Sequence, residues 1–137
     1  MPFAAGLALA LSAVVTPVSG AATAPASMPQ AQSVQQYVES YFAAEPAMIA
    51  IARCESNFRQ FDKNGEVLKN SEGSSAVGVF QIMSSVHDTT ADNLGLDLDT
   101  LEGNVAYAQH LYEDKGTAPW AASAGCWSKS SNNLALK

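Results

Sequence analysis

Apolar residues at helical spacing begin shortly after residue 30. The stretch "SVQQYVESYF" places five of them on one helical face, namely Val34, Tyr37, Val38, Tyr41 and Phe42. Ser33 directly precedes this stripe and suits the N-cap position. The pattern predicts a first helix over residues 33–42.

A second helix is predicted in "PAMIAIARCES", residues 46–56, where Pro46 suits the first turn. Glu55 shares one face of this helix with three apolar residues: Met48, Ile51 and Ala52. Because Glu55 occupies a position where the stripe would place a core residue, we expect its carboxyl group to be partly buried. Partial burial without a neighbouring cation raises the pKa of a carboxyl group.

The segment after the second helix predicts a small β-hairpin. Asn64-Gly65 is a strong hairpin turn, and it lies between two short stretches with β character, residues 58–61 and 66–68. The following "SEGSSAVGVFQIM", residues 71–83, is rich in Ser and Gly before an apolar run. It therefore predicts a loop that leads into buried structure.

Three further helical patterns complete the chain. "SSVHDTTADNLG" predicts a short helix ended by Gly95. "DTLEGNVAYAQHLYEDKG" has Asp99 and Glu102 in capping-box spacing and stops at Gly116. "APWAASAGCW" can form a last helix from Pro119. The expected fold class is α+β, mainly α, in a single domain with a minor hairpin after the second helix.

The N-terminal region has the layout of an export signal. Residues 3–18 carry no charge and are followed by the small residues "SGAATAPAS". A membrane anchor is the weaker alternative, since the run is short and Pro17 interrupts its end, and a disordered Ala-rich tail is a third. The predicted order is signal peptide, linker, folded domain and tail, over residues 1–21, 22–32, 33–130 and 131–137.

Charge and cysteine content narrow the chemistry. The net charge is -6 and the seven Lys and Arg are scattered, so the chain has no basic stripe for nucleic acid. In an exported chain Cys54 and Cys126 are expected to pair, because the compartment is oxidising. No metal site is predicted, since His87 and His110 lack ligand spacing to the cysteines. We expect both histidines to face solvent.

Four motifs in this order resemble the soluble lytic transglycosylase family of the lysozyme-like superfamily: "ARCESNF", "SAVGVFQIM", "NVAYAQHLY" and "WAASAGCW". The likeness spans about residues 46–127. The cysteine before Glu55 and the second cysteine after a tryptophan are also similar to resuscitation-promoting factors, in which the two cysteines are bonded. The resemblance implies a lysozyme-like domain, secreted or in the envelope of a bacterium, acting on peptidoglycan as a monomer without a cofactor.

The resemblance gives Glu55 the role of general acid and then base in cleaving the bond between N-acetylmuramic acid and N-acetylglucosamine, with a 1,6-anhydro product. It also implies substrate contacts for four residues: Ser56, Gly78, Gln81 and Tyr107. Three of them have a plainer alternative: Ser56 terminates a helix, Gly78 serves a turn and Gln81 bonds the backbone. Trp120 and Trp127 could stack on sugars, although core packing is favoured in so small a domain.

One departure from the family concerns its Ala-Tyr-Asn segment, whose tyrosine helps to orient the acid. This chain has "AASAGCW" there, with Ser123 near the expected tyrosine, so Tyr107 or Tyr112 is a candidate replacement. The departure keeps open a catalytically silent glycan-binding module. A hydrolase on the same fold is the other alternative.

Hydrolysis would need a second carboxylate, for which Asp62 is the best candidate, with Glu66 and Glu72 behind it. Turn formation is the favoured role of Asp62, because it precedes Lys-Asn-Gly.

Overall fold

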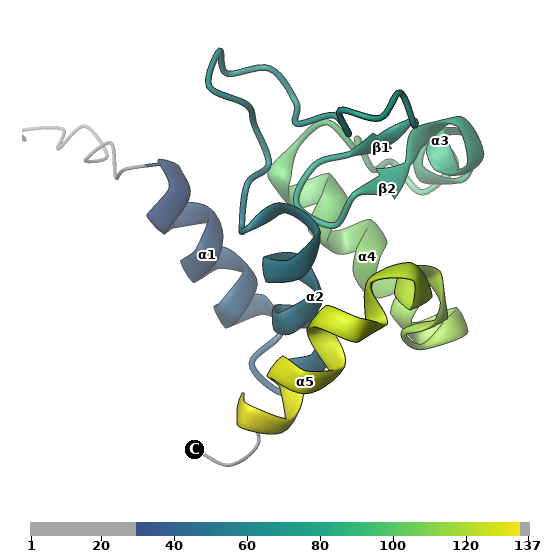
Figure 1. The fold of residues 1–137 in the computed structure, drawn as a ribbon. Coiled ribbons are helices and arrows are strands. Elements are labelled where there is room, and N and C mark those ends of the chain that lie inside the picture. Colours follow the sequence, from purple (N-terminus) through teal and green to yellow (C-terminus); the bar gives the residue numbers. More distant parts are fainter. Residues whose placement is uncertain (1–29, 135–137) are drawn as a thin grey trace, which may run out of the picture.

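The computed structural model describes residues 30–134, with side chains over 34–130 (Figure 1). The elements in chain order are α1 (Gln30–Tyr41), α2 (Pro46–Ser56), β1 (Ala76–Val77), β2 (Ile82–Met83), α3 (Ser84–Asn93), α4 (Leu101–Lys115), the 3-10 helix η1 (Ala118–Ser123) and α5 (Ala124–Leu134). This confirms a mainly helical α+β chain with a small antiparallel sheet. The predicted signal peptide, residues 1–21, lies outside the described residues.

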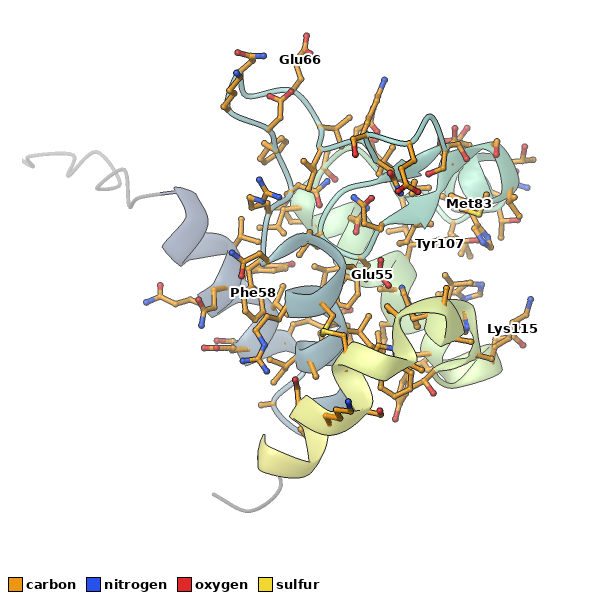
Figure 2. All side chains as sticks on the ribbon, in the orientation of Figure 1. Glu55, Phe58, Glu66, Met83, Tyr107 and Lys115 are labelled. Atoms are coloured by element: carbon orange, nitrogen blue, oxygen red, sulfur yellow. A yellow bond between two sulfur atoms is a disulfide. The ribbon has the colours of Figure 1, made fainter. Side chains whose placement is uncertain are left out.

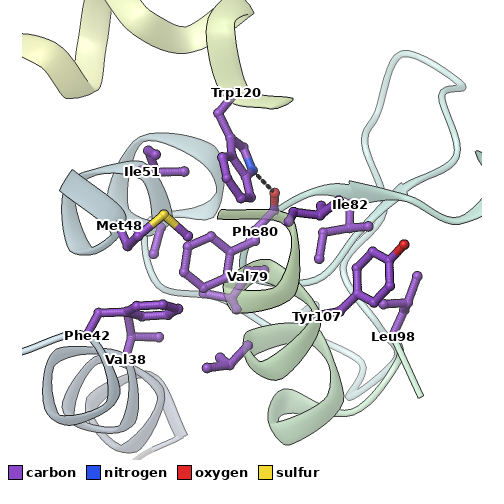
Figure 3. Close-up of a cluster of buried hydrophobic side chains, with 14 of the residues drawn as sticks. Val38, Phe42, Met48, Ile51, Val79, Phe80, Ile82, Leu98, Tyr107 and Trp120 are labelled. Atoms are coloured by element: carbon purple, nitrogen blue, oxygen red, sulfur yellow. Dashed lines mark hydrogen bonds between the residues drawn. The ribbon is translucent and has the colours of Figure 1, made fainter. Parts of the chain in front are cut away.

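One apolar core joins the helices, and Phe80 is at its centre (Figure 3). The Phe80 ring lies against Phe42 of α1 and Trp120 of η1, with centroid separations of 5.4 and 5.9 Å. The Trp120 indole Nε1 donates a hydrogen bond to the Phe80 carbonyl oxygen at 3.0 Å. These contacts hold the segment between β1 and β2 against α1 and η1.

Two predicted helix starts are wrong by a few residues. α1 already includes Gln30, so Ser33 lies inside the helix instead of capping it. The last residues of the expected linker, 30–32, are therefore helical. α4 is capped by Thr100, not by Asp99, because the Thr100 Oγ1 accepts the Gly103 N–H at 3.0 Å.

The predicted bounds of α2 are confirmed. Pro46 occupies its first turn, and Asn57 ends it in the left-handed conformation with φ of 54°. The Asn57 N–H donates to the carbonyl oxygen of Arg53 and the Phe58 N–H to that of Ala52, which satisfies two acceptors at the helix end. Ser56 is therefore the last helical residue, and Glu55 lies in the final turn.

The predicted hairpin lies in the wrong place. The antiparallel sheet pairs Ala76 with Met83 and Val77 with Ile82, in the apolar run to which the predicted loop leads. The predicted arms at 58–61 and 66–68 are joined by a single isolated bridge between Phe61 and Val67. A turn does form at Gly65, but Phe58 has a φ of 58°, which is not extended backbone, so no regular first strand develops.

Two buried amide side chains hold the turn between β1 and β2. Gln60 Oε1 accepts the Val79 N–H at 2.9 Å, and Asn104 Oδ1 accepts the Phe80 N–H at 3.0 Å. A Cβ on Gly78, where φ is +72°, would lie 2.4 Å from Asn104 Nδ2 and 2.6 Å from Gln60 Oε1. This position therefore requires glycine for packing as well as for its backbone conformation.

The predicted disulfide is confirmed. Cys54 of α2 and Cys126 of α5 are bonded, with their Cα atoms 6.1 Å apart across a sequence separation of 72 residues. The bond fastens α5 along α2, and such a bond is compatible with a protein outside the cytoplasm (Figure 1). Over residues 30–134 we find no helix of the length and apolar character needed to cross a membrane.

Candidate functional site

The site is built around Glu55, in the last turn of α2. Its side chain is half-buried, and the Ser123 hydroxyl lies 2.5 Å from its Oε1 oxygen, to which it donates a hydrogen bond. Ser123 comes from the end of η1, 68 residues further along the chain. The same hydroxyl lies 3.2 Å from the Trp120 carbonyl oxygen, a second acceptor. The residue near the family's expected tyrosine position therefore contacts the acid, in place of Tyr107 or Tyr112.

Burial raises the pKa of the Glu55 carboxyl above its usual value, and the hydrogen bond from Ser123 lowers it by a smaller amount. The position of Glu55 acts in the same direction as burial, since the C-terminal end of a helix disfavours negative charge. The expectation that the helical stripe would bury this acid is thus confirmed. A carboxyl group in this setting retains its proton to higher pH than an exposed glutamate, as a general acid must.

A groove of about 350 Å³ lies between β2 and α3 on one side and the end of α4 with η1 on the other. Its lining combines the polar side chains of Gln81, His87 and Lys115 with apolar ones that include Ile82, Met83 and Val86. Trp120 also lines the groove, and its carbonyl oxygen contacts Ser123, the partner of Glu55. Glu55 is not part of the groove lining, and η1 contacts both: Trp120 lines the groove and Ser123 bonds to the acid. Figure 2 shows Glu55, Met83 and Lys115 on three separate elements in this half of the molecule.

Gln81 lines this groove in a strained conformation. Its φ is +49°, in the left-handed region that residues other than glycine rarely adopt. Its side-chain Nε2 donates to the Gly78 carbonyl oxygen at 2.8 Å. The backbone contact that we considered as an alternative is therefore present, while the groove position remains compatible with binding a ligand. Non-glycine residues in such conformations are concentrated at functional sites.

Ser56 and Gly78 make contacts that support the fold. The Ser56 hydroxyl is buried, donates toward the carbonyl oxygens of Ala52 and Val79 at 3.1 and 2.8 Å, and accepts the Arg59 N–H. Gly78 is buried against the amides of Gln60 and Asn104. These contacts favour the helix-ending role of Ser56 and the turn role of Gly78 over direct contact with a glycan.

Tyr107 is buried, and its hydroxyl oxygen lies 2.9 Å from Nδ1 of His87. The expectation that His87 and His110 face solvent is wrong, because both are half-buried around the Tyr107 ring, at centroid separations of 5.4 and 5.5 Å. Burial lowers the pKa of His87, and the nearby charges of Lys115 and His110 lower it further. No spacing in the sequence indicated this pair, since His87 and Tyr107 come from α3 and α4.

The alternative acids and the tryptophans have other roles in the fold. Asp62 Oδ1 accepts the N–H groups of Asn64 and Glu66 at 2.7 and 3.1 Å, which is the turn role that the sequence favoured. Glu66 itself is at the tip of the long loop between α2 and β1, well away from Glu55 (Figure 2).

The two tryptophans pack in the fold. Trp120 is buried in the core, and Trp127 donates from Nε1 to the Trp120 carbonyl oxygen at 2.9 Å.

Within residues 30–134, no group of three or more His, Cys, Asp and Glu side chains is arranged to hold a metal ion. In the comparisons with known proteins, no family model matches the chain, and neither a curated protein nor a solved structure matches it. Function is therefore inferred from the geometry around Glu55 and from the motifs of the sequence.

The burial of Glu55 predicts a pH-dependent stability difference for Glu55→Gln. The pKa in the folded state is raised above 4.5, so as pH rises the unfolded chain ionises first and the charged carboxyl lowers stability. Gln keeps an acceptor for Ser123 and carries no charge. We expect the variant to melt a few degrees above the wild type at about pH 7 and equally at about pH 3.5. Thermal melts across this range test it, and a wild type that is more stable at neutral pH would contradict it.

Proposed function

We propose that this protein is a secreted peptidoglycan lytic transglycosylase with a lysozyme-like domain. The observation that carries the proposal is the half-buried Glu55, with its raised pKa and its hydrogen bond from Ser123, at the end of an apolar helix. The order of motifs around it supports the same family. The substrate is the β-1,4 bond between N-acetylmuramic acid and N-acetylglucosamine in bacterial glycan strands.

In the proposed reaction Glu55 donates its proton to the glycosidic oxygen while the bond from C1 of N-acetylmuramic acid to that oxygen breaks. The Glu55 carboxylate then takes the proton from the C6 hydroxyl of the same sugar, whose oxygen bonds to C1. The product is a 1,6-anhydro ring and Glu55 is protonated again. Water does not take part, so one carboxyl group suffices. This fits the turn role of Asp62, whose Oδ1 oxygen binds two backbone N–H groups.

Ser123 is suited to both protonation states of the acid. Its hydroxyl can donate to the Glu55 carboxylate, or donate to the Trp120 carbonyl oxygen while accepting from the protonated acid. A tyrosine hydroxyl could do the same, so Ser123 supplies the orienting function of the absent family tyrosine. This weakens the argument for a catalytically silent module.

The product chemistry tests the proposal. Mass spectrometry of muropeptides released from purified peptidoglycan by the oxidised domain should find anhydro-muramyl ends. Reducing ends would instead indicate a hydrolase on this fold. Absence of release, by folded protein that still binds glycan, would overturn the enzyme and leave a glycan-binding module.

A further inference from the structure

An unpaired cation lies at one end of the groove. Lys115 is the last residue of α4, is exposed and lines the groove, and it makes no ion pair with the described part of the chain. Of the residues that the structure describes, no acidic one lines the groove, so nothing in its lining balances the charge of this lysine. Its position favours a ligand that brings its own negative charge.

His87, beside Lys115 in the groove lining, offers a hydrogen-bond donor. The Tyr107 hydroxyl oxygen lies 2.9 Å from Nδ1 of His87. When Tyr107 donates its hydroxyl hydrogen to Nδ1, the neutral imidazole carries its hydrogen on Nε2. Since His87 lines the groove, the Nε2–H is the group that it can offer to a ligand.

Two exposed apolar side chains lie in the same groove. Met83 and Val86 have exposed fractions of 47% and 61% although both are large and hydrophobic. Figure 2 places Met83 on β2 and Lys115 at the end of α4, on the two sides of this region. The groove therefore suits a ligand that combines small apolar groups with a carboxylate.

We propose that this groove binds the lactyl-peptide substituent of N-acetylmuramic acid. Lys115 and His87 hold a carboxylate of this substituent, while Met83 and Val86 pack against the methyl groups of the same substituent. The inference rests on the proposed function, because it names the part of that substrate which the groove recognises. Lys115 is thus a specificity-determining residue. Strands whose carboxylates are blocked are poorer substrates than native strands.

Turnover of two matched substrates tests this assignment. We expect the wild type to cleave native peptidoglycan about fivefold faster, as kcat/KM, than the same glycan with its carboxylates converted to amides, with a smaller difference at high salt. Lys115→Met should abolish this preference. Lys129→Met, which removes an exposed lysine of α5 outside the groove lining, should retain it. Equal rates for both glycans in the wild type, or a preference that survives Lys115→Met, would overturn the inference.

A binding measurement separates this inference from the proposed function. Muramyl dipeptide with a free carboxylate should bind more tightly than its amide, and NMR shifts should concentrate at Met83, His87 and Lys115. If native glycan is not cleaved, the proposed enzymatic function is wrong. The comparison of these two ligands still tests whether the groove binds a carboxylate. Equal binding of the two ligands, or no binding at millimolar concentration, would overturn the assignment even for an active enzyme.

Discussion

Replacing Glu55 with Gln is expected to reduce the release of anhydro-muropeptides about 1000-fold while the domain stays folded. An amide of the same shape accepts the Ser123 hydrogen bond, but it neither donates a proton to the leaving oxygen nor removes one from the C6 hydroxyl. Both steps of the proposed reaction use the same carboxyl group, so no second acid compensates. The initial rate of product formation, measured by liquid chromatography on purified peptidoglycan, checks this expectation.

Two further variants serve as comparisons for the Glu55→Gln result. Ser123→Ala keeps the acid and loses one hydrogen bond to it, so we expect a fall of about tenfold. Glu66→Gln removes a glutamate charge at the tip of the long loop, away from Glu55, and should leave the rate unchanged. A Glu55→Gln variant that retains a tenth or more of the wild-type rate would mean that another group protonates the leaving oxygen.

The position of Glu55 was predictable because it depends on local sequence. Pro46 and the apolar stripe fixed the helix, and the stripe placed the acid on its inner face, where the structure has it half-buried. The cysteine pair was predictable for a different reason, since only two cysteines exist and an exported chain favours their oxidation.

The surroundings of Glu55 were not predictable from local pattern. Ser123 is 68 residues away, and the packing of η1 against α2 brings its hydroxyl to the acid. The buried contact of His87 with Tyr107 likewise joins α3 to α4. Periodicity describes which face of one helix is buried, but not which residues of another helix it meets. The resemblance pointed to the vicinity of Ser123 without assigning it a role.

Gln60 and Asn104 illustrate the same limit for the turn between β1 and β2. Asn104 occupies a stripe position of α4, between Leu101 and Val105, and this was a signal that its amide would be buried. Gln60 lies in an irregular segment, where no period applies. The β strands are two residues long, too short for any alternation to be detected. The strongest local signal for a hairpin is therefore the Asn64-Gly65 turn, which lies outside the sheet that forms.

Replacing both cysteines with Ala is expected to lower the free energy of unfolding by about 4 kcal/mol. The bond closes a loop across a separation of 72 residues, and opening it restores conformational freedom to most of the unfolded chain. For a domain of about this size the loss corresponds to a Tm lower by about 15–30 °C. Thermal melts of the variant, and of the wild type with and without a reducing agent, measure the effect.

The consequences of losing the disulfide should extend to the acid. Ser123 directly precedes α5, and the bond from Cys126 to Cys54 fastens α5 beside the residue that precedes Glu55. A looser α5 moves the Ser123 hydroxyl away from the Glu55 carboxyl group. The variant should therefore lose activity even at temperatures where it is still folded. The reducing agent should reproduce both changes in the wild type and leave the double variant unaffected. A variant with wild-type activity at low temperature would mean that η1 alone, through Trp120, holds Ser123 against Glu55.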